Sequence, residues 1–260
     1  MQRTHKHNQS TQTHVIRIAS YNVHSCLGLD GSTNLVRIAG IINNLDADIV
    51  ALQEVASQLG VSNDTRQLNA LAAETGLQAI AGPALIRPDS PCGTALLHRL
   101  PVLGSRHIDL SQPGREPRGA LDVDLDLQGL TVRIVSTHLG LRAYERRVQC
   151  QQLLSVLAEG KANALTILTG DMNEWWPWSR ILHEVNSCFD STEPSAPATF
   201  PARFPVLALD RLWLKSQIAR ISDLRAKKTA TTAVASDHLP LIADIVITHQ
   251  ATSTAHKLVN

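Results

Sequence analysis

Apolar and polar residues alternate along the chain in two patterns that predict strands and helices. Residues 15–22 alternate with the period of two that is typical of a strand, and apolar residues recur at helical spacing over 35–42. The run 49–52 is continuously apolar, which predicts a strand buried on both faces. The chain is therefore predicted to open with strand, helix and strand, with Asn22 and Glu54 at the two strand ends.

The same order recurs in the second half of the chain. Residues 131–138 predict a strand, 145–157 an amphipathic helix and 164–169 another buried strand. Before them, 121–127 alternates strictly between apolar and acidic residues, and Gln128-Gly129 then predicts a hairpin turn. This alternation favours a half-exposed antiparallel strand whose acidic side chains form a solvated face rather than a calcium site.

The two sections are predicted to pack together as one unit, because no linker rich in Pro, Gly or Ser divides the chain. The architecture that buries both is an α/β sandwich of two mixed sheets. We expect a single domain over residues 14–249. The polar segment 1–13 is expected to be a disordered tail, and 250–260 a second tail.

Composition and charge narrow the range of functions. With a net charge of +1 and a pI of about 7.8, the chain has no strong positive field of the kind that favours nucleic acid. None of its four cysteines lies in a CxxC pair, which argues against a zinc site of the cysteine type. Without a secretion signal we expect reduced thiols rather than disulfides, no transmembrane segment, and a soluble cytoplasmic protein.

Polar residues collect at the predicted strand ends and breaks. Asp171 and Asn173 follow a strand and a glycine, and would face one site because alternate side chains point the same way. Taken alone, this pair is equally consistent with a polar turn that has no chemical role. The whole set comprises Asn22, Glu54, His138, Asp171, Asn173, Asp210, Asp237 and His238.

The residue types in this set point to hydrolysis of a phosphate ester. Carboxylates and amides suit a hard divalent cation such as Mg²⁺ or Mn²⁺. Two histidines add acid–base capacity. A cation and positive donors offset the charge on phosphoryl oxygens while a base activates water.

Six short motifs, in a fixed order from about Val15 to Ile247, carry a family resemblance. They are Ser20–His24, Ala51–Val55, Ser136–Leu139, Thr169–Asn173, Leu209–Arg211 and Ser236–Pro240. Together they resemble the endonuclease/exonuclease/phosphatase superfamily, which has the deoxyribonuclease I-like fold. The resemblance implies a four-layer α/β/β/α sandwich, in agreement with the patterning, and a Mg²⁺- or Mn²⁺-dependent phosphodiesterase.

The resemblance also implies a role for each matching residue. Glu54 would be the principal metal ligand, with Asn22 and Asp237 beside the metal directly or through water. The catalytic residues implied are Asp171 and Asn173, which would position the attacking water or the phosphate, His238 with Asp210 as an oriented acid–base pair, and His138, which would contact the scissile phosphate or protonate the leaving group. Which histidine is the base and which is the acid stays open.

One position departs from the family pattern. Thr94 stands where relatives usually carry Asn or Glu. A hydroxyl forms hydrogen bonds but cannot supply the carboxylate that partners the residue matching His138 in the deoxyribonuclease branch. This departure argues against a close match to that branch.

The sequence gives less information about the substrate than about the fold or the site. Residues 116–121 and 198–205 resemble a bacterial branch of small hydrolases that is loosely linked to phospholipid metabolism. Arg118 and Arg203 are candidates for clamping a second phosphate or a head group. Equally, both could be surface arginines with no role in binding. Trp175, together with two further tryptophans in its loop, is a candidate for stacking on a base or entering a lipid interface, and packing on the core is the alternative.

Three functions follow, in order of preference. The first is a metal-dependent phosphodiesterase that hydrolyses a small or lipid-derived substrate by water attack, with peripheral membrane contact. The second is an endonuclease or exonuclease acting on DNA or RNA, which the near-neutral charge disfavours. The third is a non-catalytic binding module, which the filled motif positions disfavour. Nothing in the sequence indicates the oligomeric state.

Overall fold

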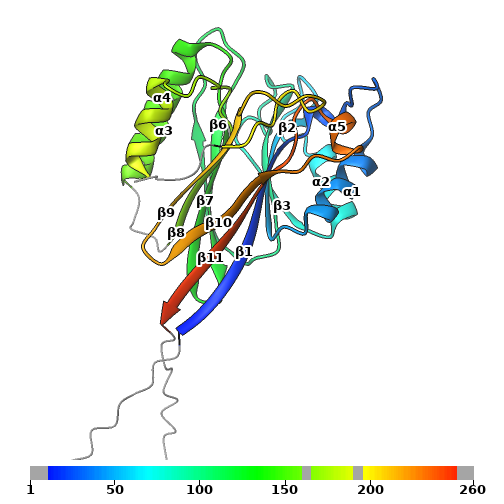
Figure 1. The fold of residues 1–260 in the computed structure, drawn as a ribbon. Helices are drawn as coiled ribbons and strands as arrows, with labels where there is room; N and C mark the ends of the chain where they lie inside the picture. The colour runs from blue at the N-terminus through cyan, green and yellow to red at the C-terminus, as the bar shows by residue number, and fades with distance from the viewer. Residues whose placement is uncertain (1–10, 160–164, 190–195, 251–260) are drawn as a thin grey trace, which may run out of the picture.

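Two β-sheets packed face to face form the centre of the molecule (Figure 1). The structure is a computed structural model that describes residues 11–159, 165–189 and 196–250. The first sheet has the order β10-β11-β1-β2-β4-β3, and the second β5-β6-β7-β8-β9. The strands are β1 (Thr11–Asn22), β2 (Ile49–Ala56), β3 (Gln78–Ala81), β4 (Cys92–His98), β5 (Val102–Asp109), β6 (Gly119–Leu127), β7 (Leu130–His138), β8 (Leu165–Asp171), β9 (Asp210–Ser216), β10 (Ala219–Ala226) and β11 (Leu241–Gln250).

Helices cover the outer faces and complete four layers, as the sequence predicted (Figure 1). α1 (Leu35–Leu45) and α2 (Arg66–Thr75) pack on the first sheet, with the short α5 (Thr232–Ala235) beside them. α3 (Ala143–Glu159) and α4 (Arg180–Cys188) pack on the second. In the described part of the chain, no helix has the length and apolar character needed to cross a membrane.

The two parallel strand pairs come from the two predicted strand–helix–strand sections. β1 pairs in parallel with β2 after α1, and β7 pairs in parallel with β8 after α3. Parallel strands need a crossover connection, which each helix provides. Parallel neighbours end at the same edge of their sheet. The hydrogen bond from Asn22, at the end of β1, to Asp171, at the end of β8, shows that both pairs end at the same end of the sandwich, where the site lies.

Strand alternation sorts the apolar side chains into three cores. On β1, Ile16 and Ile18 point into the core between the sheets, whereas Ala19 and Tyr21 point toward α1 and α2. A third core lies between the second sheet and its helices. The face of a strand residue is therefore known from its parity, and this determines which polar residues reach the seam between the sheets.

The structure corrects three predicted details. β1 begins at Thr11, so residues 11–13 belong to a strand, and β11 runs to Gln250; the rest of both predicted tails lies outside the described residues. The apolar run over 206–214, broken by Asp210 and Arg211, predicts a strand, but β9 begins only at Asp210. Before it, Leu207 forms an isolated bridge with Phe200.

The third correction concerns the predicted solvated face of 121–127. Asp122 is buried, and Arg133 on the neighbouring strand β7 donates to it at 2.8 Å, while Arg106 on β5 contacts it from the other side. A carboxylate flanked by two arginines on adjacent strands loses its contact with water. Alternation alone did not reveal these partners.

Candidate active site at the seam between the two sheets

Three ionisable side chains line up across the end of the second sheet because of strand register. Asp171, the last residue of β8, lies opposite His138 of β7 and opposite Asp210 of β9. Each shares the parity of inward-facing residues on its own strand, such as Ile167 on β8. All three therefore face the seam rather than the outer helices.

Asn22 and Glu54 reach the same point from the first sheet by different routes. Asn22 shares the parity of Ile18 on β1 and faces the seam. Glu54 adopts φ +54°, a conformation that non-glycine residues rarely adopt, and the register of β2 with β4 shifts there. This β-bulge turns Glu54 toward Asn22, whose Nδ2 donates to Oε1 at 2.9 Å. Backbone strain of this kind is concentrated at functional sites.

Oxygen Oδ2 of Asp171 is the point where the two sheets meet. Asn22 Nδ2 donates to it at 3.1 Å, and His138 Nε2 and His238 Nε2 lie 3.5 and 3.6 Å away. Burial raises the pKa of Asp171 to about 6, and the charge of Asp210 adds to this, against the opposing effects of His238 and two hydrogen bonds. A carboxylate with that pKa is ionised at neutral pH and still basic enough to accept a proton.

His238 and Asp210 form the oriented pair that the sequence predicted. His238 Nδ1 lies 2.8 Å from Asp210 Oδ2, which also accepts from Thr199 Oγ1 at 2.5 Å. Burial lowers the pKa of His238, but the charge and hydrogen bond of Asp210, helped by Asp171 and Asp237, outweigh it and raise the pKa to about 10. The ring therefore favours the imidazolium form.

His138 has the opposite surroundings. Its Nδ1 lies 3.1 Å from Arg118 Nη1, and its Nε2 lies 3.0 Å from Asn173 Nδ2. Burial, followed by the positive charges of Arg118 and His238, holds the pKa of His138 well below 6.5. Arg118 is only 8% exposed, so it is no surface arginine. Thr94 Oγ1 is buried and has no hydrogen-bond partner in the described part of the chain.

The donor set of the site fits a hard divalent cation. Glu54 and Asp237 present carboxylates with side chains 28% and 32% exposed, and Asp171 adds a buried one. Asp210 Oδ1 is buried and without a hydrogen-bond partner among the described residues. Ligand atoms of Asp171, Asp210 and His238 also lie within 4.8 Å of one another. Oxygen-rich sites of this kind suit Mg²⁺ or Mn²⁺ better than softer metals.

A family model described as "Endonuclease/Exonuclease/phosphatase family" matches residues 19–238. The chain belongs to the endonuclease/exonuclease/phosphatase family. Members of this family are hydrolases that act on phosphoester bonds. Over 249 residues the chain is 30% identical to "Uncharacterized protein YbhP" of Escherichia coli K12. This alignment covers 90% of this chain and 98% of YbhP.

Solved structures of the endonuclease/exonuclease/phosphatase family share the fold. A member from Beutenbergia cavernae superimposes with a TM-score of 0.71 at 22% identity, covering 90% of this chain and 72% of that one. A member from Bacteroides vulgatus gives 0.72 at 19% identity, covering 89% and 98%. These likenesses confirm the predicted deoxyribonuclease I-like sandwich.

Most of the residues expected from the family motifs lie together, and their roles stay predictions. Asp237 is partly exposed at the edge of the candidate site, and its Oδ1 is 3.9 Å from His24 Nδ1. Arg203 is exposed, and Trp175 is 49% exposed in the loop after β8. Sequence reasoning missed Thr199, which holds Asp210, and Ser236, whose Oγ donates to Asn22 O at 2.7 Å. Both stand inside motifs that the sequence singled out, so their polar character was the available signal.

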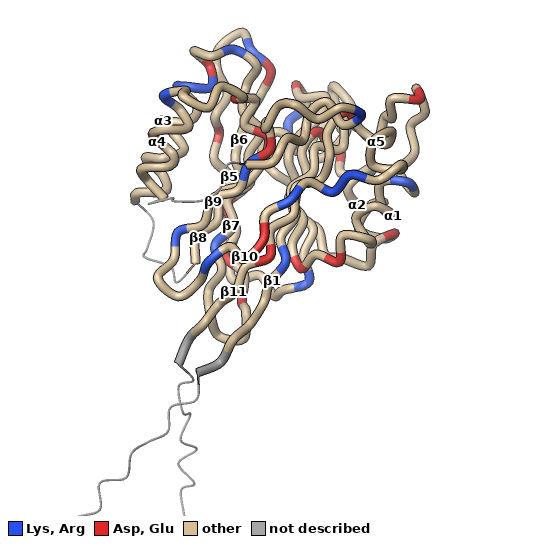
Figure 2. Tube along the Cα trace, viewed as in Figure 1, with Lys and Arg blue, Asp and Glu red and all other residues tan. Residues whose placement is uncertain are grey.

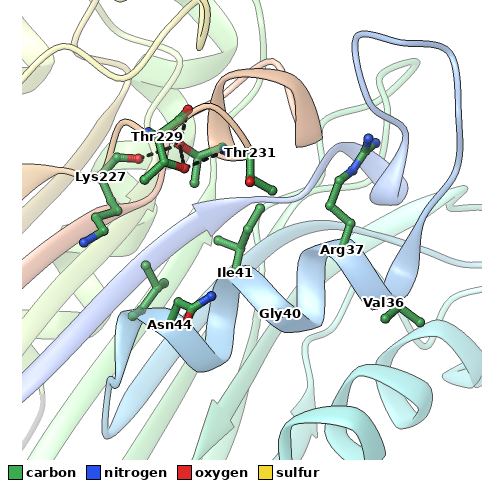
Figure 3. A pocket seen from close by; sticks show the side chains of 10 residues that line it. Val36, Arg37, Gly40, Ile41, Asn44, Lys227, Thr229 and Thr231 are labelled. Carbon is green, nitrogen blue, oxygen red and sulfur yellow. Dashed lines mark hydrogen bonds between the residues drawn. The ribbon is translucent and has the colours of Figure 1, made fainter.

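A separate cavity of about 560 Å³ lies between α1 and the segment 227–232 (Figure 3). Ile41 and Asn44 of α1 face Thr229 and Thr231 across it in the figure. Among the described residues that line this cavity, none is acidic or a histidine. It therefore lacks the groups that hydrolysis of a phosphoester requires, and the seam remains the candidate site.

Proposed function

We propose that the protein is a divalent-metal-dependent phosphodiesterase that hydrolyses a small or lipid-derived substrate by water attack. The observation that carries this proposal is the convergence of Asn22, His138 and His238 on Asp171 Oδ2, within 3.6 Å. A purely structural role would not require two buried histidines and an aspartate with perturbed pKa values at the open end of a sandwich.

The chain's own groups divide the work. Asp171 orients the attacking water and takes up its proton at Oδ2, as its pKa of about 6 allows. His238, held by Asp210, adds positive charge beside the phosphoryl group. Asn173 and His138 contact the phosphoryl oxygens. As the water oxygen bonds to phosphorus, the bond to the leaving oxygen breaks.

Glu54 and Asp237, with Asn22 beside them, are the proposed metal ligands. A bound Mg²⁺ or Mn²⁺ supplies Lewis-acid polarisation of the phosphoryl group and offsets charge on the leaving oxygen. Asn22 Nδ2 orients Glu54 through its 2.9 Å hydrogen bond, and Asn22 Oδ1 accepts from the backbone N–H of His24 at 3.1 Å. These contacts hold the carboxylate of Glu54 in place at the mouth of the site.

Exposed aromatic side chains that follow or precede the strand ends of the site, here called the apolar rim, support a lipid-derived substrate. The loop after β8 exposes three tryptophans, and Trp176 meets Trp175 and Trp178 edge-on at 5.5 and 5.2 Å. They pack on each other and remain about half to four-fifths exposed, so the loop does not bury them in the core. Tyr144, after β7, and Phe204, before β9, are 78% and 70% exposed. Amphipathic aromatic rings favour the lipid–water interface.

Nuclease activity is the second candidate, because exposed tryptophans also stack on unpaired bases. Against it, Figure 2 shows Lys and Arg interspersed with Asp and Glu along the trace in this view, and the net charge is only +1. Duplex binding draws its affinity from phosphate neutralisation by clustered cations.

The unpaired state of all four cysteines supports the cytoplasm as the compartment.

Hydrolysis by purified protein tests the proposal. Activity with Mg²⁺, Mn²⁺ or EDTA is measured on bis(p-nitrophenyl) phosphate, single- and double-stranded DNA, RNA and phospholipid vesicles. We expect activity that EDTA abolishes, with lipid preferred over nucleic acid. Preference for DNA or RNA would instead establish the nuclease, and inactivity on every substrate would favour the binding module.

Replacing one carboxylate separates the metal site from the fold. Glu54→Gln is expected to lower kcat/KM by about 100-fold or more and to weaken Mn²⁺ binding measured by calorimetry, because an amide is a poor metal ligand. Glu74→Gln, at an exposed position of α2, is the matched control and should change neither. Full activity and Mn²⁺ affinity in Glu54→Gln would contradict the metal assignment.

A further inference from the structure

Arg118 meets the ring nitrogen of His138 that points away from Asp171. Its Nη1 lies 3.1 Å from Nδ1, while Nε2 of the same ring lies 3.5 Å from Asp171 Oδ2. Arg118 is held at both ends: Nη2 donates to Glu116 Oε2 at 3.0 Å, and the backbone carbonyl accepts from the N–H of Leu110 at 3.0 Å. The guanidinium is therefore fixed against the imidazole.

This contact determines where the proton of His138 sits. A guanidinium only donates hydrogen bonds, so Nδ1 must accept, and a neutral ring then carries its proton on Nε2. Asn173 Nδ2 also approaches Nε2, at 3.0 Å, and one of its two N–H groups donates to Leu139 O at 2.8 Å. The charge-assisted bond from Arg118 is the stronger of the two and sets the tautomer.

His238 shows the opposite arrangement at a similar distance from Asp171. A carboxylate, Asp210, faces its Nδ1, so this nitrogen carries a proton. The two histidines thus approach one oxygen with Nε2, at 3.5 and 3.6 Å, but with partners of opposite charge behind them. Opposite partners give the two rings different protonation states and different roles.

A direct phosphate contact by Arg118 fits the surroundings less well. One Nη is used by His138 and the other by Glu116, and the side chain is only 8% exposed. Its Nε has no hydrogen-bond partner in the described part of the chain, but it is buried. A substrate phosphate would have to displace one of these partners to reach the guanidinium.

We propose that Arg118 is a positioning residue that fixes the neutral His138 ring with its proton on Nε2, so that Nε2–H faces the phosphoryl group as a hydrogen-bond donor. The kinetic consequence rests on the proposed function. The tautomer is a property of the free protein and holds with or without a substrate. A carboxylate partner, which Thr94 cannot provide, would instead accept from Nδ1–H and place a proton on that nitrogen.

Long-range ¹H–¹⁵N NMR of histidine-labelled protein tests the tautomer directly. The signals of His138 are assigned by their loss in His138→Gln. We expect the Nε2–H pattern in the unsubstituted protein and in Arg118→Lys, and a shift away from it in Arg118→Met, which keeps chain length without a donor. Arg115→Gln removes an exposed arginine from the same loop and should leave the pattern unchanged. An Nδ1–H pattern in the unsubstituted protein overturns the proposal, even if Arg118→Met fails to fold.

Kinetics on bis(p-nitrophenyl) phosphate test the consequence. Loss of the group that orients a catalytic imidazole costs about 10- to 100-fold, and we expect this loss in kcat for Arg118→Met, with little change in KM and partial rescue by Arg118→Lys. A rise in KM with kcat and tautomer unchanged would show that Arg118 binds substrate, and would overturn the proposal. If the unsubstituted protein hydrolyses nothing, the proposed function fails, whereas the NMR result still decides whether Arg118 fixes His138.

Discussion

Residue by residue, the site is defined by what lies behind each ionisable group. Burial acts on Asp171, His138 and His238 alike. It raises the pKa of Asp171 and lowers the pKa of His138, where nearby positive charges add to the effect. At His238 the negative charges of neighbouring carboxylates outweigh burial and raise the pKa. Asp210 stabilises an imidazolium, and Arg118 stabilises a neutral ring. Two residues of the same type are thereby made chemically different.

Asp210→Asn tests the oriented pair. The amide keeps the size of the side chain but presents no negative charge to His238 Nδ1, so the ring loses its protonated form and its fixed orientation. We expect kcat to fall by about 10²- to 10⁴-fold, as when the carboxylate partner of a catalytic histidine is lost. Steady-state kinetics with circular dichroism as the folding check measure this. A kcat within the error of the unsubstituted protein would mean that His238 takes no part.

The residues of the candidate site were predictable from sequence, whereas their contacts with one another were not. Polar residues at strand ends stand out against apolar runs, which is why Asp171 and His138 were found. Arg118 was singled out only as a candidate phosphate clamp, and its contact with His138, 20 residues away, follows from the pairing of β6 with β7. The left-handed backbone of Glu54 is equally invisible, because it arises from pairing with β4.

At the level of elements, the sequence predicted the central strands and one largely buried edge strand, β9, but missed the other sheet edges. β3, β5 and β10 were not predicted, and all three lie at the edge of a sheet. An edge strand buries few side chains, and β5 is exposed along most of its length. A strand without a buried face is under no selection to alternate apolar and polar residues, so its sequence shows no strand pattern. The central strands, which carry most of the site, have the strongest pattern.

Gly170 allows β7 and β8 to approach where they present His138 and Asp171. Its φ is +139°, and an added Cβ would collide with the carbonyl oxygen of Thr137. We expect Gly170→Ala to lower the free energy of unfolding by about 1–3 kcal/mol and to reduce activity more than stability, because the strand ends separate. Urea unfolding and kinetics measure both. Gly104→Ala on β5, where a Cβ meets no atom within 4 Å, is the control and should be nearly neutral.

A cross-strand ion pair ties β1 to β11 and gives stability a defined pH dependence. Arg17 lies opposite Asp244, donates to it at 2.6 Å, and thereby holds the pKa of Asp244 below its usual value, with help from Arg225. A carboxyl with a depressed folded pKa stabilises the fold above its unfolded pKa of about 3.9, and this contribution is lost as pH falls through the folded pKa.

Asp244→Asn should therefore destabilise the protein at neutral pH and lose its effect in acid. We expect a loss of about 1 kcal/mol, since the pair is partly exposed and screened by water. Thermal unfolding followed from pH 7 into acid measures the difference from the unsubstituted protein. A difference that stays constant through the acid range would show that charge is not its source.

For the whole molecule, the main functional feature is that reactive groups and exposed aromatic side chains share one end. The start of α3 after β7 and the loops after β8 and before β9 carry the apolar rim, and the same strand ends carry His138, Asp171 and Asp210. A surface that holds this rim at a bilayer would also hold the seam against lipid head groups. Under the proposed function, substrate recognition and chemistry would lie at one end of the fold.

Trp178→Ser tests the rim. The side chain is 79% exposed, so unfolding should change by less than about 0.5 kcal/mol. Burying an indole at an interface is worth about 1.5–3 kcal/mol, so sedimentation with phosphatidylcholine–phosphatidylglycerol vesicles should show binding weakened by about 10-fold or more. Val15→Ser, at an exposed apolar position in the half of β1 away from Asn22, is the control. Equal vesicle binding by both variants would remove the support for a lipid-derived substrate.

The position of β1 makes the order of synthesis matter for activity. This first strand lies between β2 and β11, and its Asn22 reaches Asp171, 149 residues further along the chain, across the seam. His238 stands directly before β11, so it enters the site only when that last strand pairs with β1. A chain still on the ribosome therefore carries Glu54 and Asp171 but no assembled catalyst. Under the proposed function, hydrolysis would begin only after β11 has emerged and paired with β1, so a partly made chain would not attack phosphoesters around it.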